Sequence, residues 1–377
     1  MKARPRVLYV QYTSPSAYPP LEHGSQLLAE AGWDVLFLGT SKVGDPALHW
    51  SARQGIHVRE LPPAGSGWLR RLHYGWFAAW VLAWTLRWRP RCVYASDLLA
   101  CPIVLALSYV PGLLVVYHEH DTPLHGGRAF RWARRKLATR ADVRVLPNQL
   151  RATHFNETVA NHRPTLTAWN CPARSELAPR REARSTDELK LVYAGSIVPE
   201  RLPATVIEAL AHVPGAVQLD VVGYTTQGHP EYVRELQSFA MRLGVEQRVR
   251  FMPAVPHPEL LEQLRTADVG LVLMSEWGDA QWMPGASNKP FDYLASGLAL
   301  LVADEPGWRE LYADPGYGLA CNAREPQSIA AALTWFLENR DEMRAMGERG
   351  RQRVAQDWNY ETQFGPVRDW LVRRAVG

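Results

Sequence analysis

Short apolar runs alternate with longer segments of helical periodicity along the whole chain. Residues 6–10 read as a buried strand, residues 21–31 as a helix that Gly32 ends, and residues 34–38 as a second strand. Tight connections of this kind are typical of parallel sheets, in which a helix links each strand to the next. The same pattern predicts further helices and strands at residues 68–87, 92–95, 98–108, 113–117, 128–139 and 143–146.

A second series of the same kind follows a polar, arginine-rich stretch at residues 174–187. Its predicted strands are residues 191–195, 218–222, 249–252, 269–274 and 299–303, and its predicted helices are residues 203–212, 230–243, 257–266, 288–296, 326–337 and 341–356. The pattern therefore predicts an α/β fold with two tandem doubly wound, Rossmann-like domains. We place them at residues 1–170 and 171–359. Ligands should bind at the carboxyl ends of the strands, in the cleft between the two domains.

Charge is distributed unevenly between these two domains. The 377 residues include 42 Lys and Arg and 38 Asp and Glu, which gives a net charge of +4. Residues 1–170 hold 20 basic and 10 acidic residues, whereas residues 171–377 hold 22 and 28. The basic first half indicates an anionic partner such as a membrane surface or a phosphorylated substrate. Nucleic acid is not expected, because no nucleic-acid-binding module is present.

Four cysteines without CxxC spacing argue against a disulfide framework or a structural zinc site. No signal-peptide core follows the charged N-terminal segment. Residues 98–117 carry no charge, but Pro102 and Pro111 interrupt them, so we predict a buried helix and a buried strand rather than a membrane span. A cytoplasmic location is expected, and peripheral attachment to the inner face of the plasma membrane stays open.

Several catalytic motifs are absent from the sequence. It contains no GxxxxGK[ST], GxSxG or HExxH, and its first strand is not followed by GxGxxG. These absences argue against a P-loop NTPase, an α/β-hydrolase, a zincin and a nicotinamide dehydrogenase. There is also no DxD pair, so no metal and no other cofactor are expected.

Residues 285–297 are the segment most suggestive of ligand binding. Ser287 and Asn288 are favourable N-cap residues, and a helix that starts there presents free backbone N–H groups to an anion. Lys289 adds a mobile cation in the first turn. Asp292 follows on the same face, where its carboxylate can accept hydrogen bonds from ribose hydroxyls. An ordinary capped helix is the alternative interpretation.

The order of residues in this segment, Asn-Lys-x-x-Asp-Tyr-x-Ala-x-Gly before an apolar strand, resembles the donor-binding helix of GT-B glycosyltransferases, specifically the GT4 family. Residues 191–201, 267–271 and 117–121 are similar to other segments of that family, so the resemblance covers nearly the whole chain. It implies transfer of a sugar from a nucleotide diphosphate sugar to an acceptor sugar or lipid-linked sugar. It further implies retention of configuration, no bound metal, and a place in bacterial-type polysaccharide or glycolipid assembly. In this fold a last helix, at about residues 360–377 here, packs back on the first domain.

This resemblance assigns the donor to the second domain. The implied donor-binding residues are Gly195, Ser196, Arg201, Gly223, Ser287, Asn288, Lys289 and Asp292. The family's Arg-Lys pair for the diphosphate corresponds to Ser196 and Arg201, so a hydroxyl replaces one cation. Its two glutamates would fall at Pro284 and Asp292, so the first carboxylate is missing.

His120 and Asp121 are the expected catalytic residues, on the acceptor side. His118 and His120 share a face at the end of a predicted strand, where a parallel sheet presents functional groups. The His120 imidazole can hydrogen-bond a sugar hydroxyl or stabilise charge on the leaving group. Packing beneath the next helix is the alternative for either histidine. A metal site that also uses Glu119 and His125 is not expected, because strand alternation turns these side chains to opposite faces.

Tryptophan and arginine gather on two predicted helices of the first domain. Trp76, Trp80, Trp84 and Trp88 recur every four residues and therefore form one stripe. Core packing is one interpretation, and contact with a membrane interface is the other. On the helix at 128–139, helical periodicity leaves four side chains for solvent, anionic lipid or a lipid-diphosphate acceptor: Arg128, Arg131, Arg134 and Arg135.

Two other classes of function remain open at this stage. One is a sugar-nucleotide epimerase of the same fold, which would need further acid and base groups. The other is a non-catalytic subunit that binds lipid or a partner, which Ser196 and the missing carboxylate at Pro284 would favour.

Overall fold

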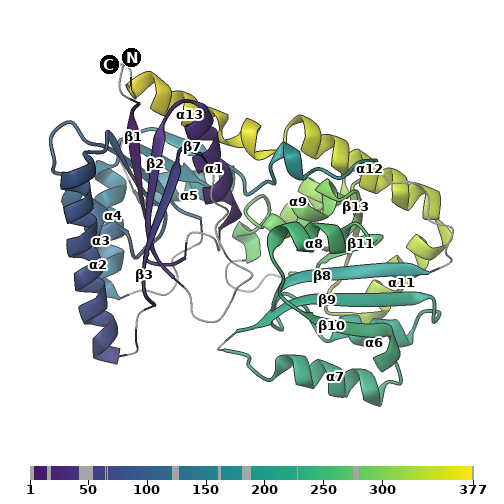
Figure 1. Ribbon diagram of the computed structural model, residues 1–377. Coiled ribbons are helices and arrows are strands. Elements are labelled where there is room, and N and C mark those ends of the chain that lie inside the picture. The colour runs from purple at the N-terminus through teal and green to yellow at the C-terminus, as the bar shows by residue number, and fades with distance from the viewer. Residues whose placement is uncertain are drawn as a thin grey trace. The chain divides into compact units, whose positions relative to one another are not determined.

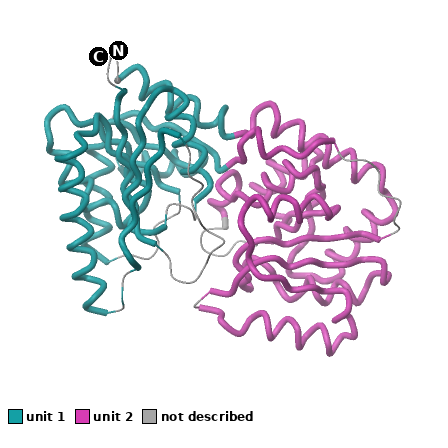
Figure 2. Tube along the Cα trace, in the orientation of Figure 1, with its two compact units in different colours: residues 1–170, 360–377 teal, residues 171–359 magenta. Residues whose placement is uncertain are grey.

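The computed structural model divides into two compact units (Figure 2). Unit 1 consists of residues 1–170 and 360–377, and unit 2 consists of residues 171–359. The structure describes residues 4–14, 18–41, 54–63, 65, 67–120, 127–159, 163–180, 188–226, 228–274 and 280–375.

Unit 1 contains a seven-stranded parallel sheet with the strand order β3-β2-β1-β4-β5-β6-β7 (Figure 1). Its strands are β1 (Arg6–Val10), β2 (Asp34–Thr40), β3 (Ile56–Leu61), β4 (Cys92–Ala95), β5 (Leu114–His118), β6 (Val143–Leu146) and β7 (Thr165–Thr167). Its helices are α1 (Pro19–Glu30), α2 (Gly67–Trp88), α3 (Cys101–Leu107), α4 (Arg128–Arg140), α5 (Gln149–Thr158) and α13 (Tyr360–Ala375).

Both faces of this sheet are covered by helices, which explains the apolar strands. Leu8 and Val10 of β1 belong to the core beneath α2, α3, α4 and α5. Val7 and Tyr9 belong to the opposite core, with residues of α1 and α13. Figure 1 shows these two helical layers on either side of the sheet.

Unit 2 contains a six-stranded parallel sheet with the order β10-β9-β8-β11-β12-β13. Its strands are β8 (Leu189–Ile197), β9 (Val217–Thr225), β10 (Val249–Pro253), β11 (Val269–Val272), β12 (Ala299–Ala303) and β13 (Gly318–Cys321). Its α-helices are α6 (Thr205–Ala211), α7 (Tyr232–Arg242), α8 (His257–Leu264), α9 (Asn288–Ala295), α10 (Pro306–Trp308), α11 (Pro326–Glu338) and α12 (Arg340–Gln356). Shorter turns of helix are η3 (Arg174–Glu176), η4 (Glu246–Arg248), η5 (Ala280–Trp282) and the π-helix η6 (Arg309–Ala313).

Each sheet has a point at which the strand order reverses direction. It lies between β1 and β4 in unit 1, and between β8 and β11 in unit 2. Doubly wound sheets bind ligands in the crevice at the carboxyl ends of these strands. The residues that follow β8 and β11 are therefore candidates for a ligand-binding site. Helix α9 is the first α-helix after β11.

The predicted fold class is confirmed, with differences at the sheet edges. Residues 98–117 form α3 and β5, as predicted, and among the described residues no helix is long and apolar enough to cross a bilayer. Three strands and two helices were not predicted: β3, β7, β13, α5 and the short α10. The strands β3, β7 and β13 lie at the outer edges of their sheets, and no long apolar run marks them in the sequence. All four cysteines are buried free thiols.

Candidate functional site

The end of strand β8 and the start of helix α9 meet through Lys289 and Tyr193. The ammonium of Lys289 lies 3.0 Å from the Tyr193 hydroxyl and 4.5 Å from the centre of its ring. That hydroxyl donates its own proton to the carbonyl of Ser196 at 2.5 Å, which leaves its oxygen free to accept from Lys289. The sequence predicted a mobile cation at this position, whereas the structure shows one held in place. Tyr193 was not recognised from the sequence.

Two glycines allow Lys289 to lie against strand β8. Gly195 has a φ of +124°, and a β-carbon on it would lie only 2.5 Å from Lys289 Cε. Gly223 is the register partner of Gly195 on β9, and a β-carbon on it would strike the Gly195 carbonyl oxygen. The two glycines lie inside their strands, because β8 and β9 continue beyond the predicted ends. Glycine is needed at both positions for steric reasons.

Arg201 supplies a second cation beside this lysine. Its Nη1 donates a hydrogen bond to Ser196 Oγ at 2.8 Å. Burial, and after it the positive charge of Arg201, lower the pKa of Lys289 well below its usual value. No carboxylate of the described residues forms an ion pair with either cation. Two neighbouring cations without an acidic partner create a positive potential that favours an anion.

The N-terminus of α9 adds to this positive potential. The helix begins at Asn288, and Ser287 has the extended backbone of an N-cap residue. Ser287 thus occupies the predicted N-cap position, although its side chain makes no capping hydrogen bond. Backbone N–H groups in the first turn of a helix, together with the helix dipole, stabilise a bound anion.

Asp292 is held by a histidine that sequence reasoning did not reveal. It is only 8% exposed, and its Oδ1 lies 3.4 Å from Nε2 of His257. The other ring nitrogen of His257 lies 3.3 Å from a carboxylate oxygen of Glu176. Burial lowers the pKa of His257, but Asp292 and Glu176 outweigh it and raise the pKa to about 11. His257 is therefore a cation held between two carboxylates at neutral pH.

Tyr293, the residue after Asp292, anchors α9 to the sheet. Its hydroxyl oxygen accepts a hydrogen bond of 2.8 Å from the backbone N–H of Ala194 on β8. Its ring lies so close to Gly270 of β11 that a β-carbon there would overlap it. Sequence reasoning missed both contacts, which fix Lys289 relative to β8.

In unit 1, the rings of His118 and His120 lie side by side at the end of β5, on one face as predicted, and are tilted by 35°. Their ring centres are 3.7 Å apart, and the hydroxyl of Tyr94 lies 2.6 Å from His118 Nδ1. His118 is completely buried, so the packing interpretation holds for it. His120 is 5% exposed, and neither ring nitrogen has a partner among the described residues. Asp121 and His125 lie outside the described residues.

His120 is a neutral imidazole throughout the physiological pH range. Burial, and after it the positive charge of Arg151, lower its pKa to about 3. Arg151 also donates a hydrogen bond to the His120 carbonyl at 2.9 Å. A neutral imidazole carries one N–H donor and one acceptor nitrogen, so His120 can bind a hydroxyl group in either sense.

Solvent exposure was predicted for four arginines of α4, and for Arg134 this prediction is wrong. Arg134 Nε lies 2.6 Å from a carboxylate oxygen of Glu119 and also donates to the Tyr117 hydroxyl at 3.2 Å. Arg151 approaches the other oxygen of Glu119, so this carboxylate is shared by two arginines. Helical periodicity alone did not reveal that Glu119, just after β5, reaches α4. The remaining three side chains are exposed, as predicted: Arg128, Arg131 and Arg135.

The predicted tryptophan stripe has two environments. Trp80, Trp84 and Trp88 are partly buried against the core of unit 1, so the packing interpretation holds for them. Trp76 is 54% exposed. Other large apolar side chains exposed on α2 and α4 are Trp68, Leu69, Leu72, Leu82, Leu86 and Trp132.

Most of unit 2 matches a known protein family. Residues 175–353 match the model of the family described as glycosyl transferases group 1. These residues form a group 1 glycosyl transferase domain. Every candidate donor residue, from Gly195 to Asp292, lies within this glycosyl transferase domain.

Curated relatives match about half of the chain. A GDP-mannose-dependent alpha-(1-6)-phosphatidylinositol monomannoside mannosyltransferase of Mycobacterium tuberculosis is 26% identical over 199 residues, which is 53% of this chain and 51% of the relative. A D-inositol 3-phosphate glycosyltransferase of Geodermatophilus obscurus is 29% identical over 191 residues, which is 47% of this chain and 40% of the relative. The chain thus spans about half the length of the curated relatives it matches, or less.

Solved structures share the complete fold. A sucrose-phosphate synthase from Thermosynechococcus elongatus has a TM-score of 0.77 at 16% identity and covers 99% of both chains. HepE from Anabaena, in complex with UDP and glucose, has a TM-score of 0.75 at 18% identity and covers 98% of this chain and 99% of its own. These likenesses establish the fold of two Rossmann-like domains that GT-B glycosyltransferases share.

Proposed function

We propose that this protein transfers a sugar from a nucleotide diphosphate sugar to an acceptor hydroxyl. The observation that carries the proposal is the pair of cations Arg201 and Lys289, unneutralised by any described carboxylate and located within the glycosyl transferase domain. In such a transfer the leaving group is a nucleoside diphosphate, which gains negative charge as the bond to the sugar breaks. Cations that are already in place stabilise that charge without reorganisation.

In this proposal the two cations and the N-terminus of α9 each bind oxygen atoms of the diphosphate. Arg201 donates one hydrogen bond to Ser196 Oγ, and its other N–H groups can donate to phosphate oxygens. Lys289 stands over Tyr193 at the first turn of α9, whose backbone N–H groups offer further donors. We propose no metal for this task, because these residues supply the positive charge that a metal would otherwise provide.

Asp292 is proposed to hold the ribose of the donor. Its Oδ1 is engaged by His257, which leaves Oδ2 to accept a hydrogen bond from a ribose hydroxyl. The ion pair orients the Asp292 carboxylate, since His257 remains protonated at neutral pH.

The acceptor is proposed to bind unit 1, where His120 offers a neutral imidazole with two unpartnered ring nitrogens. Retention of configuration and a role in glycolipid or polysaccharide assembly are proposed from the family resemblance. A relative that is named as acting on a phosphatidylinositol monomannoside supports a lipid-linked acceptor.

Peripheral binding to an anionic membrane surface, on the cytoplasmic side, is proposed for unit 1. Trp68 and Trp76 on α2 and Trp132 on α4 are more than half exposed. Exposed arginines, Arg128 and Arg135 among them, lie on the same helix as Trp132. Tryptophan with arginine favours the headgroup region of a bilayer.

A transfer assay tests the proposed activity. The purified chain is incubated with UDP-glucose or GDP-mannose, with and without myo-inositol 3-phosphate or a phosphatidylinositol mannoside as acceptor. We expect nucleoside diphosphate to be released only when an acceptor is present, and Lys289→Met to abolish the release. The matched control Lys136→Met, at an exposed position on α4, should retain it. Epimerised donor in the reaction without acceptor, or full turnover by Lys289→Met, would overturn the proposal.

A further inference from the structure

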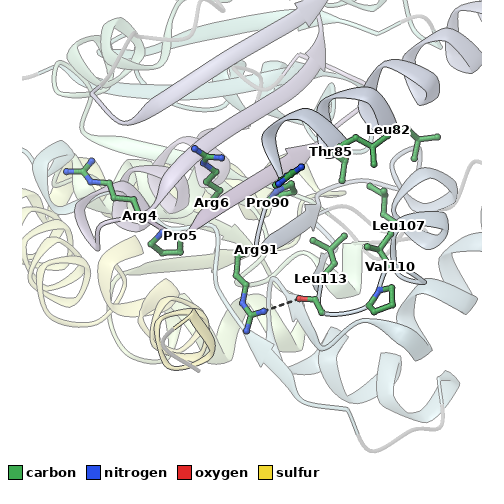
Figure 3. Close-up of a pocket in the computed structure, with 14 residues that line it drawn as sticks. Arg4, Pro5, Arg6, Leu82, Thr85, Pro90, Arg91, Leu107, Val110 and Leu113 are labelled. Atoms are coloured by element: carbon green, nitrogen blue, oxygen red, sulfur yellow. Dashed lines mark hydrogen bonds between the residues drawn. The ribbon is translucent and has the colours of Figure 1, made fainter. Parts of the chain in front are cut away.

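A pocket of about 980 Å³ lies at the amino-terminal edge of the unit 1 sheet, opposite the edge that carries His120 (Figure 3). Its walls come from the residues that precede β1, β4 and β5, from the last turns of α2, and from the loop after α3. No residue of the proposed donor or acceptor sites lines it, so the proposed function does not explain it.

Four arginines line this pocket: Arg4, Arg6, Arg89 and Arg91. No aspartate or glutamate lines it, and none of these arginines forms an ion pair with a described carboxylate. Arg6 donates to the Trp88 carbonyl at 2.8 Å, and Arg91 donates to the Gly112 carbonyl at 3.1 Å. Carbonyl groups orient the two guanidinium groups but do not neutralise them, so the pocket keeps a strong positive potential.

The other side of the pocket is apolar. Figure 3 shows Leu82, Leu107, Val110 and Leu113 on one side, Arg4 and Arg6 on the other, and Arg91 between them. This apolar wall continues onto the outer surface of α2 through Leu86, which is 78% exposed. Charge on one side and hydrocarbon on the other match an amphiphile with an anionic head.

Arg89 has a backbone conformation that is unusual for its residue type. Its φ is +50°, and it is the one residue other than glycine with a positive φ among the described residues. It follows the last residue of α2, where glycine is the favoured residue because it adopts this conformation without steric cost. An arginine at such a position indicates that its side chain has a task that glycine cannot perform.

We propose that this pocket binds one anionic phospholipid, with the phosphate on the arginines and an acyl chain along the wall formed by Leu82, Val110 and Leu113. Phosphate and guanidinium groups form charge-assisted, often bidentate hydrogen bonds. Inorganic phosphate would satisfy the arginines but leave the apolar wall exposed to water. The site goes beyond the proposed sugar transfer and does not depend on it.

Calorimetric titration of the full chain with dihexanoyl phosphatidic acid, below its micelle concentration, tests this site without a bilayer. We expect binding that weakens with salt, and at least about tenfold weaker binding of inorganic phosphate and of dihexanoyl phosphatidylcholine. The variant Arg89→Gly should lose at least about tenfold in affinity for the lipid, and it should unfold at the same temperature or higher because it removes the positive-φ strain. Arg87→Ala, an exposed arginine of the same helix outside the pocket, is the matched control and should bind like the wild type.

A second variant tests the apolar wall. Val110→Glu places a carboxylate at a half-exposed position, so the fold should tolerate it while the lipid is repelled. Wild-type affinity in either Arg89→Gly or Val110→Glu would overturn the proposal. Equal affinity for inorganic phosphate and for the lipid would also overturn it, because the pocket would then be an anion site without lipid selectivity.

Discussion

Lys289 lies so close to the backbone of Gly195 that a β-carbon on residue 195 would be only 2.5 Å from Lys289 Cε. This contact joins helix α9 to strand β8 at the point where the strand order of the unit 2 sheet reverses. It holds the ammonium over the Tyr193 ring and beside Arg201, where burial and like charge disfavour its protonated form. A bound diphosphate would relieve that cost, which is consistent with the proposed binding of the donor diphosphate beside Lys289.

The variant Gly195→Ala should displace Lys289 and destabilise unit 2. Its β-carbon would overlap the lysine side chain, and φ is +124° at this position, so we expect a loss of about 2 kcal/mol in the free energy of unfolding. Denaturant titration measures this loss. Gly215→Ala, where nothing lies within 4 Å of the added carbon, should behave like the wild type. Equal stability of the two variants would contradict the steric account.

His257 should make the stability of the protein depend on pH. The folded state holds its proton up to about pH 11, whereas an ordinary histidine loses it near pH 6.5, so the folded state binds the extra proton between these values. The contribution to stability is therefore complete below about pH 6.5 and is lost as the pH rises toward 11. We expect the stability difference between wild type and His257→Gln to shrink steadily from pH 6 to pH 9.

Denaturant unfolding at several pH values measures that difference. His212→Gln, at an exposed position of unit 2, serves as the control and should remove none of the wild-type pH dependence. A stability difference between wild type and His257→Gln that stays constant with pH would show that His257 is not held between Asp292 and Glu176 as a cation.

Arg134 and Arg135 are neighbours in sequence but should respond differently to substitution. Arg134→Ala leaves the buried Glu119 carboxylate with one fewer partner and should cost about 3 kcal/mol of stability. Arg135→Ala, at an exposed position, should change stability by less than about 0.5 kcal/mol. The order should reverse for vesicles that contain phosphatidylglycerol, since of these two arginines Arg135 is the exposed one on the proposed membrane-facing surface. Vesicle binding that depends on Arg134 rather than Arg135 would argue against the proposed membrane-facing surface.

His120 should act without changing its charge. Because its pKa is about 3, the activity should show no titration of this residue between pH 5 and pH 9. If His120 contacts the substrates, His120→Asn should lower kcat by about 10²-fold, in proportion to one lost hydrogen bond in the transition state. Steady-state kinetics across pH measure both effects, with circular dichroism as a check on folding. A variant that keeps the wild-type kcat would remove His120 from the site.

Strands buried on both faces were the predictable part of the fold. Residues 6–10 and 299–303 lie beneath helices on either side and are almost wholly apolar, so their sequence marks them clearly. Strand β3 lies at a sheet edge and includes His57 and Arg59, while β7 has only three residues. Neither has a periodicity long enough to distinguish it from a loop.

The candidate site was predictable where its residues share one segment. The order from Ser287 to Asp292 marks α9, and the glycines mark the close approach to it. The partners of Asp292 could not be predicted, because Glu176 and His257 come from distant parts of the chain and belong to no motif. The ion pair between Arg134 and Glu119 could not be predicted for the same reason, because it depends on how α4 packs against β5.

Binding of UDP and GDP, measured by calorimetric titration, tests the central claim most directly. The account predicts that the wild type binds at least one of these diphosphates more tightly than the matching monophosphate, and that Arg201→Ala and Lys289→Met each weaken this binding at least about tenfold. Arg234→Ala, an exposed arginine paired with Glu231, should bind like the wild type. Unchanged diphosphate affinity in both Arg201→Ala and Lys289→Met would contradict the account.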